Sequence, residues 1–299
     1  MYDCFFIVNP ASGSGKAKKL FDGLLPRIER SGRSFEWRYT TGKGHARKLA
    51  EEAAKRGCRR VISVGGDGTA NEVAGALIGS DTEMAILPFG TGNDFAKAVG
   101  LPTDPDAALD AALYGAARPV DAAMANDKPF INVGGTGFDV DVILNTERFK
   151  RRFNGMLPYM LGIFKSLMHL KPVTFQITAD GESFTERALL FNACNGTHFA
   201  GGMHVAPMAS PNDGLLDVCI LRAISVPQFL MLLPRYTRGA HMASRHIRYF
   251  KAESIAVRCD SENLINLDGE LDSSTPVTFR VLPGALRLAL PGEKGNVNA

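Results

Sequence analysis

The sequence predicts an α/β fold made of two domains, the first with a mostly parallel sheet and the second an antiparallel β-sandwich. Up to about residue 120, short apolar runs alternate with helix-like stretches, which is typical of βαβ units. After about Asp121, apolar and polar residues alternate in period two between turn signals, which is typical of antiparallel strands. A length of 299 residues also favours two domains. We expect them to span residues 1–122 and 123–299, and the last strand could return to the first domain.

The first domain shows four strand patterns with helix patterns between them. The predicted strands are Phe5–Val8, Phe35–Thr40, Val61–Val64 and Met84–Phe89. The predicted helices are Lys18–Arg30, Lys43–Lys55 and Asn71–Ile78. Short connections between them predict parallel strands, and ligands of such sheets bind at the carboxyl ends of the strands.

The second domain shows five period-two runs and one helical stretch. The strands are predicted at 174–178, 188–191, 216–221, 254–257 and 277–281. Turns are predicted at Asp180-Gly181, at Asn212-Asp213-Gly214 and at Pro283-Gly284. A helical hairpin is expected at Leu157–Leu170.

Composition narrows the class of protein. The chain is 45% apolar and 22% charged, as in globular proteins with a sizeable core. A net charge of +3 is too small to indicate nucleic acid as a partner. The five cysteines include no CxxC pair and indicate reduced thiols. Without a signal peptide pattern or a run of about 20 apolar residues, we expect a cytoplasmic protein whose membrane contact, if any, is peripheral at the inner face.

The turn Gly65-Gly66-Asp67-Gly68-Thr69 is the most informative motif. It joins an apolar strand to a helix, so its free N–H groups and the helix dipole attract phosphate oxygens. Asp67 would repel a bare anion, which makes a cation such as Mg²⁺ the natural mediator. The alternative is a plain strand-to-helix turn with Asp67 as the helix cap.

Two further turns of similar composition follow other strands. Asn9–Lys16 is rich in Ser and Gly but lacks the Walker A pattern, because Pro10 and Ala17 stand where Gly and Ser or Thr are required. Gly90–Phe95 follows the fourth strand. Because parallel strands end at one edge of the sheet, we expect the three turns to lie side by side there. A flexible surface loop is the alternative for the first turn.

Three carboxylates suit phosphoryl transfer to an alcohol. Such a reaction needs a general base near the hydroxyl and a cation near the transferred group. Glu270, in Asn266-Leu267-Asp268-Gly269-Glu270, supplies a base, and Asp67 and Asp121 could hold the metal. A plain hairpin turn is the alternative for Asp268-Gly269-Glu270.

Four ordered motifs resemble the bacterial diacylglycerol kinase-like lipid kinases, relatives of the soluble diacylglycerol and sphingosine kinases. They are Asn9–Gly13, Gly65–Glu72, Gly90–Phe95 and Leu267–Glu270. The resemblance implies a nucleotide-binding first domain, with ATP and Mg²⁺ as cofactors. It implies ATP contacts from Asn9, Pro10, Ala11, Ser12, Gly13, Thr40, Gly65, Gly66, Asp67, Gly68, Thr69, Ala70, Asn71 and Thr91. It also implies that Glu270 is the catalytic base, supported by Asp67 and Asp121.

A fifth segment, Ala206–Asp217, resembles the structural Mg²⁺ loop of the same family. The resemblance implies that Asp213 and the carbonyl oxygens of Ser210 and Leu215 bind this metal, and such hard oxygen ligands suit Mg²⁺. A hairpin turn without a metal is the alternative.

The predicted activity is transfer of the γ-phosphoryl group of ATP to a lipid hydroxyl, with diacylglycerol as the leading acceptor. Phosphatidylglycerol, a sphingoid base or another lipid alcohol are alternative acceptors. A kinase of NAD or a sugar phosphate and a non-catalytic sensor of nucleotide or lipid are the other hypotheses. Basic and aromatic residues at 148–153, beside the apolar stretch Leu157–Met168, favour a segment that meets a lipid surface; a helix buried against the sandwich is the alternative. A homodimer is left open.

Overall fold

The computed structural model describes residues 2–150, 152–153, 157–260 and 262–292, and the chain divides into two compact units. The N-terminal unit comprises the residues up to Val120 and those from Gly284 onward. The C-terminal unit comprises Asp121–Pro283. Two strands, β5 (Ala116–Ala125) and β15 (Val277–Leu290), contain the boundaries between the units.

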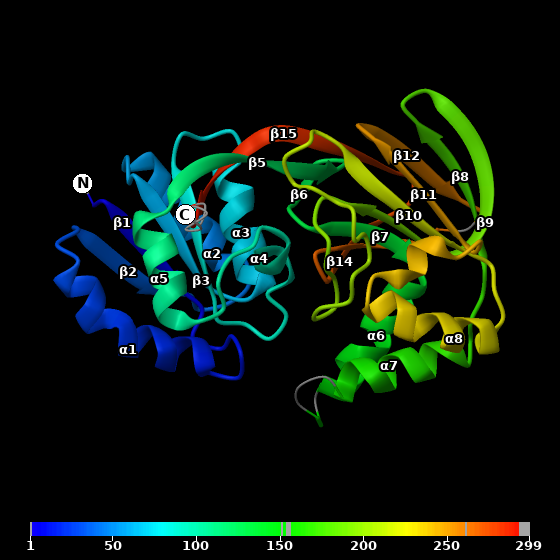
Figure 1. The fold of residues 1–299 in the computed structure, drawn as a ribbon, viewed down its shortest axis with the longest axis horizontal. Helices are drawn as coiled ribbons and strands as arrows, with labels where there is room; N and C mark the ends of the chain where they lie inside the picture. The colour runs from blue at the N-terminus through cyan, green and yellow to red at the C-terminus, as the bar shows by residue number, and fades with distance from the viewer. Residues whose placement is uncertain (1, 151, 154–156, 261, 293–299) are drawn as a thin grey trace, which may run out of the picture. The chain divides into compact units, whose positions relative to one another are not determined.

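The N-terminal unit is built on a parallel sheet (Figure 1). Its strand order is β2 (Phe35–Tyr39), β1 (Cys4–Val8), β3 (Arg60–Gly65), β4 (Glu83–Pro88) and the end of β15. Each neighbouring pair is parallel, and β15 pairs with β4 through Leu288 and Met84. The prediction of a mostly parallel sheet is confirmed.

Helices cover both faces of this sheet. They are α1 (Lys16–Arg30), α2 (His45–Lys55), α3 (Asp67–Leu77), α4 (Asp94–Ala98) and α5 (Pro105–Tyr114). One core cluster joins buried residues of α1 and α5 to alternate strand residues such as Phe6, Ile62 and Leu87. Successive side chains of a strand point to opposite faces. The intervening residues, such as Ile7 and Val61, are therefore buried on the other face of the sheet, which α2 and α3 cover.

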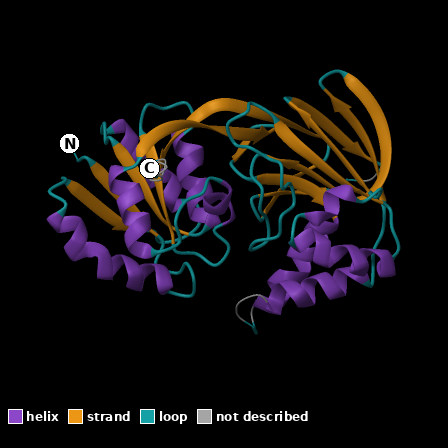
Figure 2. Cartoon of the chain, in the orientation of Figure 1, coloured by secondary structure: helices purple, strands orange, loops and turns teal. Residues whose placement is uncertain are grey.

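The C-terminal unit is an antiparallel sandwich, as predicted (Figure 2). Its remaining strands are β6 (Lys128–Phe130), β7 (Val133–Gly137), β8 (Val173–Ala179), β9 (Glu182–Cys194), β10 (Leu216–Arg222), β11 (Ile247–Ala252), β12 (Ser254–Cys259), β13 (Leu264–Leu267) and β14 (Glu270–Ser274). The long strand β9 pairs with β7, β8 and β10. The core holds four fully buried rings that form a chain of ring contacts in the order Phe130, Phe279, Phe191 and Phe175.

Three helices pack on the sandwich, and two of them were not predicted from the sequence. They are α6 (Phe138–Lys150), α7 (Leu157–Leu167) and α8 (Val226–Thr237), and a 3₁₀ turn at Ala240–Ala243 follows α8. The expected hairpin within Leu157–Leu170 is wrong in extent, because α7 is only its second helix and α6 is the first. The sequence of α6 shows only a weak helical period, and α8 contains Pro234, which argues against a helix. Ser225 and Gln228 do form a capping box, a signal that could have located α8.

The predicted turn at Pro283-Gly284 is also wrong, because β15 continues through it. Gly284 has φ +58, and a Cβ there would lie 3.4 Å from Pro119 Cβ. A glycine with positive φ inside a strand is typical of a local irregularity that bends the strand without ending it. The chain passes between the two units at this position.

Burial of Asp139 in α6 predicts a pH-dependent stability. Desolvation raises the pKa of this carboxyl from 3.8 to about 6, although Asn266 Nδ2 donates a 3.0 Å hydrogen bond to it. The protonated form is therefore favoured in the folded state, so stability is lost as the pH rises from about 4 to about 6. We expect Asp139→Asn to remove most of this loss, about 2–3 kcal/mol, in denaturant titrations across this pH range.

The matched control for this experiment is Asp127→Asn, on the exposed turn between β5 and β6. It should keep the wild-type pH dependence of the free energy of unfolding. An unchanged pH dependence in Asp139→Asn would exclude Asp139 as the source.

Candidate functional site

The three Gly-rich turns meet at the carboxyl edge of the parallel sheet, as predicted. A Cβ at Gly90 would lie 2.3 Å from the Cα of Gly66, and a Cβ at Gly13 would lie 2.8 Å from the carbonyl oxygen of Phe89. A Cβ at Gly65 would lie 3.0 Å from Ser12 Oγ. Only glycine permits such close approaches, so contacts between the turns explain the glycines at 13, 65 and 90.

The first turn is joined to the second by the side chain of Asn9. Its Nδ2 donates to Thr69 Oγ1 at 3.0 Å, and its Oδ1 accepts from the backbone N–H of Ala11 at 3.1 Å. Pro10 and Ala11 follow on the outer part of this turn, and the N–H of Ser12 donates to the carbonyl of Asn9. Asn9 therefore fixes the turn from both sides with one amide group.

Asp67 begins α3, but it does not cap this helix. The N-cap is Gly66, and no side chain caps this end. The Asp67 carboxylate instead accepts from the backbone N–H of Phe95 at 3.2 Å, which links the second turn to the third. Burial, and secondarily the charge of Asp94, raises the pKa of Asp67. The interpretation of Asp67 as a helix cap is wrong, because its carboxylate reaches across to a neighbouring turn.

The third turn is shaped by Asn93, which has φ +53. Its Oδ1 accepts from the Gly90 N–H at 2.9 Å, and its Nδ2 donates to the carbonyl oxygens of Pro88 and Gly90. Thr91 is exposed on this turn, and the buried Asp94 starts α4, with its Oδ1 3.5 Å from Lys97 Nζ. Asn93 therefore shapes the third turn, and Asp94 starts the helix that follows it.

The remaining predicted nucleotide contacts lie along the same edge. Thr40 follows β2, and its N–H donates to the carbonyl of Val8 at 2.9 Å. Gly68 is exposed in the first turn of α3, whereas the side chain of Ala70 is buried. Asn71 follows with a buried Oδ1 that has no hydrogen-bond donor among the described residues.

Glu72 has a role that the sequence did not reveal. Its carboxylate accepts from the N–H groups of Gly44 at 2.7 Å and Ala46 at 3.0 Å, at the start of α2. A carboxylate at a helix N-terminus stabilises the helix. Glu72 therefore links α3 to the N-terminus of α2 through hydrogen bonds.

Asp121 lies in the C-terminal unit and holds the predicted metal loop. It is 3% exposed, and its Oδ2 accepts from the Gly214 N–H at 2.8 Å. Its own N–H donates to the carbonyl of Pro211 at 2.8 Å. The sequence predicted Asp121 and the 210–215 loop as separate features. In the structure they are in direct contact.

Asp213, the predicted carboxylate ligand of that loop, faces a lysine. Its Oδ2 lies 2.6 Å from Lys251 Nζ, and the fully buried Asp217 lies 3.6 Å from the same nitrogen. Burial raises the pKa of Asp217 to about 6, although the charge of Lys251 lowers it. The Ser210 carbonyl lies 3.4 Å from the Asp213 N–H, and the Leu215 N–H donates to Asp213 Oδ1. In the described ranges no three His, Cys, Asp or Glu side chains cluster as a metal site.

Glu270 is the first residue of β14, directly after the turn of the β13–β14 hairpin. Asp268, with φ +51, accepts hydrogen bonds of 2.8–3.0 Å from the N–H groups of Ile131, Asn132 and Val133. Asn266 Oδ1 accepts from the Gly269 N–H at 2.8 Å. The Glu270 side chain is exposed. Asp268 is thus the anchor that fixes the backbone beneath Glu270.

Comparisons with known proteins agree with this arrangement. Two family models match the chain: the diacylglycerol kinase catalytic domain over residues 3–125, and the YegS C-terminal NAD kinase beta sandwich-like domain over residues 132–290. A "Diacylglycerol kinase" of Bacillus subtilis (strain 168) is 34% identical over 96% of both chains. A "Probable lipid kinase YegS-like" of Cronobacter sakazakii (strain ATCC BAA-894) is 33% identical over 96% of this chain and 95% of that protein.

The chain belongs to the bacterial diacylglycerol kinase-like lipid kinase family. Solved structures agree with the family's fold. One from Bacillus anthracis str. Sterne, described as a diacylglycerol kinase, has a TM-score of 0.75 at 23% identity and covers 97% of both chains. Another from the same organism has a TM-score of 0.81 at 25% identity, also over 97% of both chains. Membership makes the chain a kinase, and ATP is the phosphoryl donor that the family implies.

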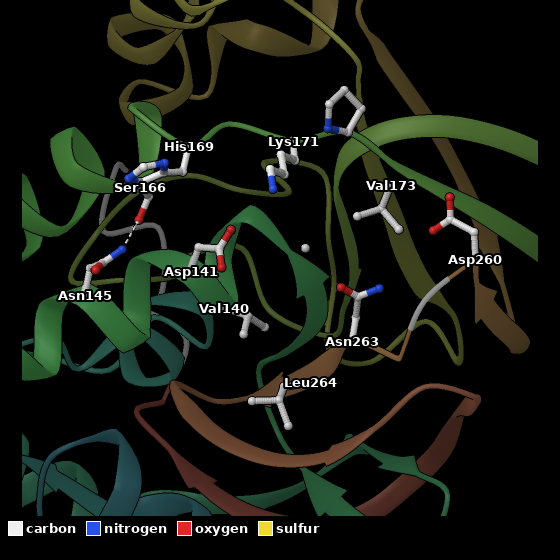
Figure 3. Close-up of a pocket in the computed structure, with 12 residues that line it drawn as sticks. Val140, Asp141, Asn145, Ser166, His169, Lys171, Val173, Asp260, Asn263 and Leu264 are labelled. Atoms are coloured by element: carbon white, nitrogen blue, oxygen red, sulfur yellow. Dashed lines mark hydrogen bonds between the residues drawn. The ribbon is translucent and has the colours of Figure 1, made fainter.

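A cavity of about 630 Å³ lies in the C-terminal unit of this family member (Figure 3). Asp141 and Asp260 line it together with His169 and Lys171, so both signs of charge are present. Burial raises the pKa of Asp141, and the neighbouring His169 and Lys171 side chains act in the opposite direction. None of the predicted site residues lines the cavity, although it reaches Leu264 in β13, the first strand of the hairpin whose second strand begins at Glu270.

No helix in the described part of this lipid kinase family member is long and apolar enough to cross a membrane.

The contact between Gly66 and Gly90 predicts a strong effect of one added methyl group. Gly90→Ala should push the second and third turns apart, lowering the free energy of unfolding by about 1–3 kcal/mol and weakening nucleotide binding. Chemical denaturation and calorimetric titration with ATP would measure both effects.

Gly23→Ala is the control for this substitution. Gly23 is exposed in the middle of α1, and a Cβ there would meet nothing within 4 Å. It should stabilise the protein by about 0.5–1 kcal/mol without changing nucleotide binding. Equal ATP affinity in Gly90→Ala and the wild-type protein would show that the turn contact does not support the nucleotide site.

Proposed function

We propose that this protein is an ATP- and Mg²⁺-dependent lipid kinase that phosphorylates diacylglycerol to phosphatidate. The observation that supports this most directly is the meeting of three Gly-rich turns at one sheet edge, beside the start of α3. Backbone N–H groups at such an edge bind phosphate oxygens. The names of the relatives supply the acceptor, because several are diacylglycerol kinases.

In this proposal the N-terminal unit binds ATP. The turn residues Asn9–Gly13, Gly65–Asn71 and Thr91 contact the nucleotide, and Thr40 extends the same edge beyond β1. The glycines allow phosphates to approach the backbone without meeting a Cβ. Asn9 and Asn93 keep the first and third turns in shape through their amide hydrogen bonds.

Asp67 suits a magnesium ion brought with the nucleotide. Mg²⁺ is commonly held by one or two carboxylates together with substrate phosphates. Burial, and secondarily the charge of Asp94, raises the pKa of Asp67, and a cation near Asp67 would favour its charged form. When bound, the ion would neutralise negative charge on the phosphates.

Glu270 is the proposed general base. Its carboxylate accepts the proton of the lipid hydroxyl as the hydroxyl oxygen attacks the γ-phosphorus, and ADP departs with the electrons of the broken P–O bond. The exposed side chain at the end of a hairpin fixed by Asp268 suits a group that must meet an incoming substrate.

Asp121 supports the site as a positioning residue in this proposal. Its carboxylate holds the loop that contains Asp213, through the Gly214 N–H. The oxygens of Asp213, Ser210 and Leu215 form a donor set of the kind that Mg²⁺ prefers. Lys251 already forms an ion pair with Asp213, with 2.6 Å between Nζ and Oδ2. A metal ion in this loop would therefore compete with this ammonium group for the carboxylate.

A panel assay tests the proposed reaction. The purified protein with ATP and Mg²⁺ should convert diacylglycerol in mixed micelles to phosphatidate, with one ADP formed for each product, and chelation of Mg²⁺ should stop the reaction. Phosphatidylglycerol, a sphingoid base, NAD and sugar phosphates are tested in parallel. Phosphorylation of NAD without any lipid would contradict the proposal, and the absence of any transfer would favour a sensor.

Glu270→Gln tests the general base. The substitution keeps the size of the side chain but removes its basicity, so kcat should fall about 10²–10⁴-fold while ATP affinity stays unchanged. Initial rates and calorimetric ATP titration measure the two quantities separately.

The matched control is Glu182→Gln, an exposed position of the same unit at the start of β9. It should retain the wild-type rate. Full activity of Glu270→Gln would exclude Glu270 as the base.

A further inference from the structure

The cavity of about 630 Å³ in the C-terminal unit has the size of a small-molecule site. Asp141 and Asn145 lie one turn apart on α6, so they share one face of this helix. His169 and Lys171 line the cavity from the link between α7 and β8. The two helices are packed closely, because a Cβ at Gly162 of α7 would lie 2.3 Å from the nearest atom of α6. One wall of the cavity is therefore fixed by helix packing.

A second wall comes from the loop between β12 and β13. Asp260 directly follows β12, and its backbone N–H donates to a carbonyl of β8 at 3.2 Å. Figure 3 shows Asp141 and Asp260 on opposite sides of the cavity, with the side chain of Lys171 drawn between them in this view. The apolar side chains that complete the lining include Val140, Val173 and Leu264. The cavity therefore combines acidic groups on two sides with an apolar surface.

Four ionisable side chains of the cavity have no hydrogen-bond or ion-pair partner within the part of the chain that the structure describes. They are Asp141, His169, Lys171 and Asp260. Burial raises the pKa of Asp141, and the charges of His169 and Lys171 act in the opposite direction, so these three groups lie near one another. A charge that protein partly encloses gains from a ligand of opposite charge, because it has lost part of its hydration.

A hydroxyl group adds a donor beside the cations. Ser166 is 2% exposed, and its Oγ accepts from Asn145 Nδ2 at 2.9 Å (Figure 3). The hydroxyl proton of Ser166 therefore points away from Asn145 and can be donated to a ligand. His169 follows closely, and its backbone N–H donates to the Ser166 carbonyl at 3.1 Å. Ser166, His169 and Lys171 thus form a set of donors suited to a carboxylate.

The charges of the cavity favour one kind of ligand. Counting histidine as neutral, the cavity carries two carboxylates and one ammonium group. A ligand that complements these charges has two cationic groups and one carboxylate, and basic amino acids have this composition. We propose that the cavity binds a basic amino acid such as lysine or arginine. This ligand plays no part in the proposed kinase reaction, and none of the residues proposed for that reaction lines the cavity.

The charged groups of such a ligand match the order of the residues around the cavity. Its α-carboxylate binds Lys171 and Ser166, and its α-ammonium group, on the neighbouring carbon, binds Asp141. The aliphatic part of its side chain packs on the apolar lining, and the cationic end binds Asp260 on the other side. Each charged group of the ligand thus has a partner of opposite sign.

Ligands with other charges fit this cavity less well. A diamine would place a cation beside Lys171 without supplying a carboxylate for it. A dicarboxylate would place anions beside Asp141 and Asp260. Both would leave like charges facing each other in a partly enclosed space, where water screens them poorly.

The neighbouring basic stretch 148–153 is separate from this cavity. None of its described residues lines the cavity, and its Arg151 lies outside the described residues. Its contact with a lipid surface stays a prediction of its own.

Calorimetric titration of the full chain, without ATP or lipid, tests the proposal. Lysine or arginine should bind saturably at one site per chain. Norleucine lacks the side-chain ammonium group of lysine and cadaverine lacks its carboxylate, so each should bind at least about tenfold more weakly. The absence of saturable binding of lysine and arginine up to about 10 mM would overturn the proposal, as would cadaverine that binds as tightly as lysine.

Three substitutions assign the binding to this cavity. Asp141→Asn, Asp260→Asn and Lys171→Met should each weaken lysine binding about tenfold, because each removes one charged partner. Lys171→Met should not weaken the binding of cadaverine, which has no carboxylate to lose its partner. A structural effect alone would weaken the binding of both ligands alike.

Asp127→Asn and Lys128→Met are the matched controls, at exposed positions of the same unit. Both should bind lysine as the wild-type protein does, and circular dichroism checks that each variant is folded. Equal lysine binding in the cavity variants and in these controls would overturn the proposal. The kinase assay is read separately: a protein that phosphorylates no lipid but binds lysine in this cavity would contradict the proposed function alone.

Discussion

The close approach of Gly66 to Gly90 is the contact on which the loop edge of the N-terminal unit depends. With a Cβ at Gly90 only 2.3 Å from the Cα of Gly66, even alanine requires the backbone to move. Gly13 against Phe89 and Gly65 against Ser12 extend the same close packing to the first turn. The parallel strands bring the three turns to one edge of the sheet. The turns can contact one another there because glycine has no side chain. The proposed phosphate site is therefore a consequence of backbone packing as much as of hydrogen-bond donors.

Within each unit, acidic residues fix turns of the backbone, a role that their sequence motifs do not reveal. Asp67 reaches from the second turn to the third, Asp121 holds the 211–214 segment, and Asp268 accepts three N–H groups beneath Glu270. Each carboxylate satisfies backbone donors of a turn that regular secondary structure leaves unpaired. Glu270, by contrast, is exposed on a backbone that Asp268 holds in place, which is the arrangement expected of a reacting group supported by a structural one.

One helix of the C-terminal unit, α7, is buried along one face and exposed along the other. One face of α7 contributes to the core with α6 and α8, and the other leaves Phe164 and Met168 exposed.

The sequence by itself determined the parallel α/β unit, the antiparallel sandwich and the three turns, because alternating strand and helix patterns, strand periodicity and glycine spacing are local signals. It also predicted the resemblance that the comparisons confirmed. Only the tertiary structure decided that Asp67 links two turns instead of capping α3, that Lys251 faces Asp213, and that β15 runs through Pro283-Gly284. It also decided the pairing of α6 with α7 and which face of α7 stays exposed. These features depend on contacts between residues far apart in the chain, which no local pattern records.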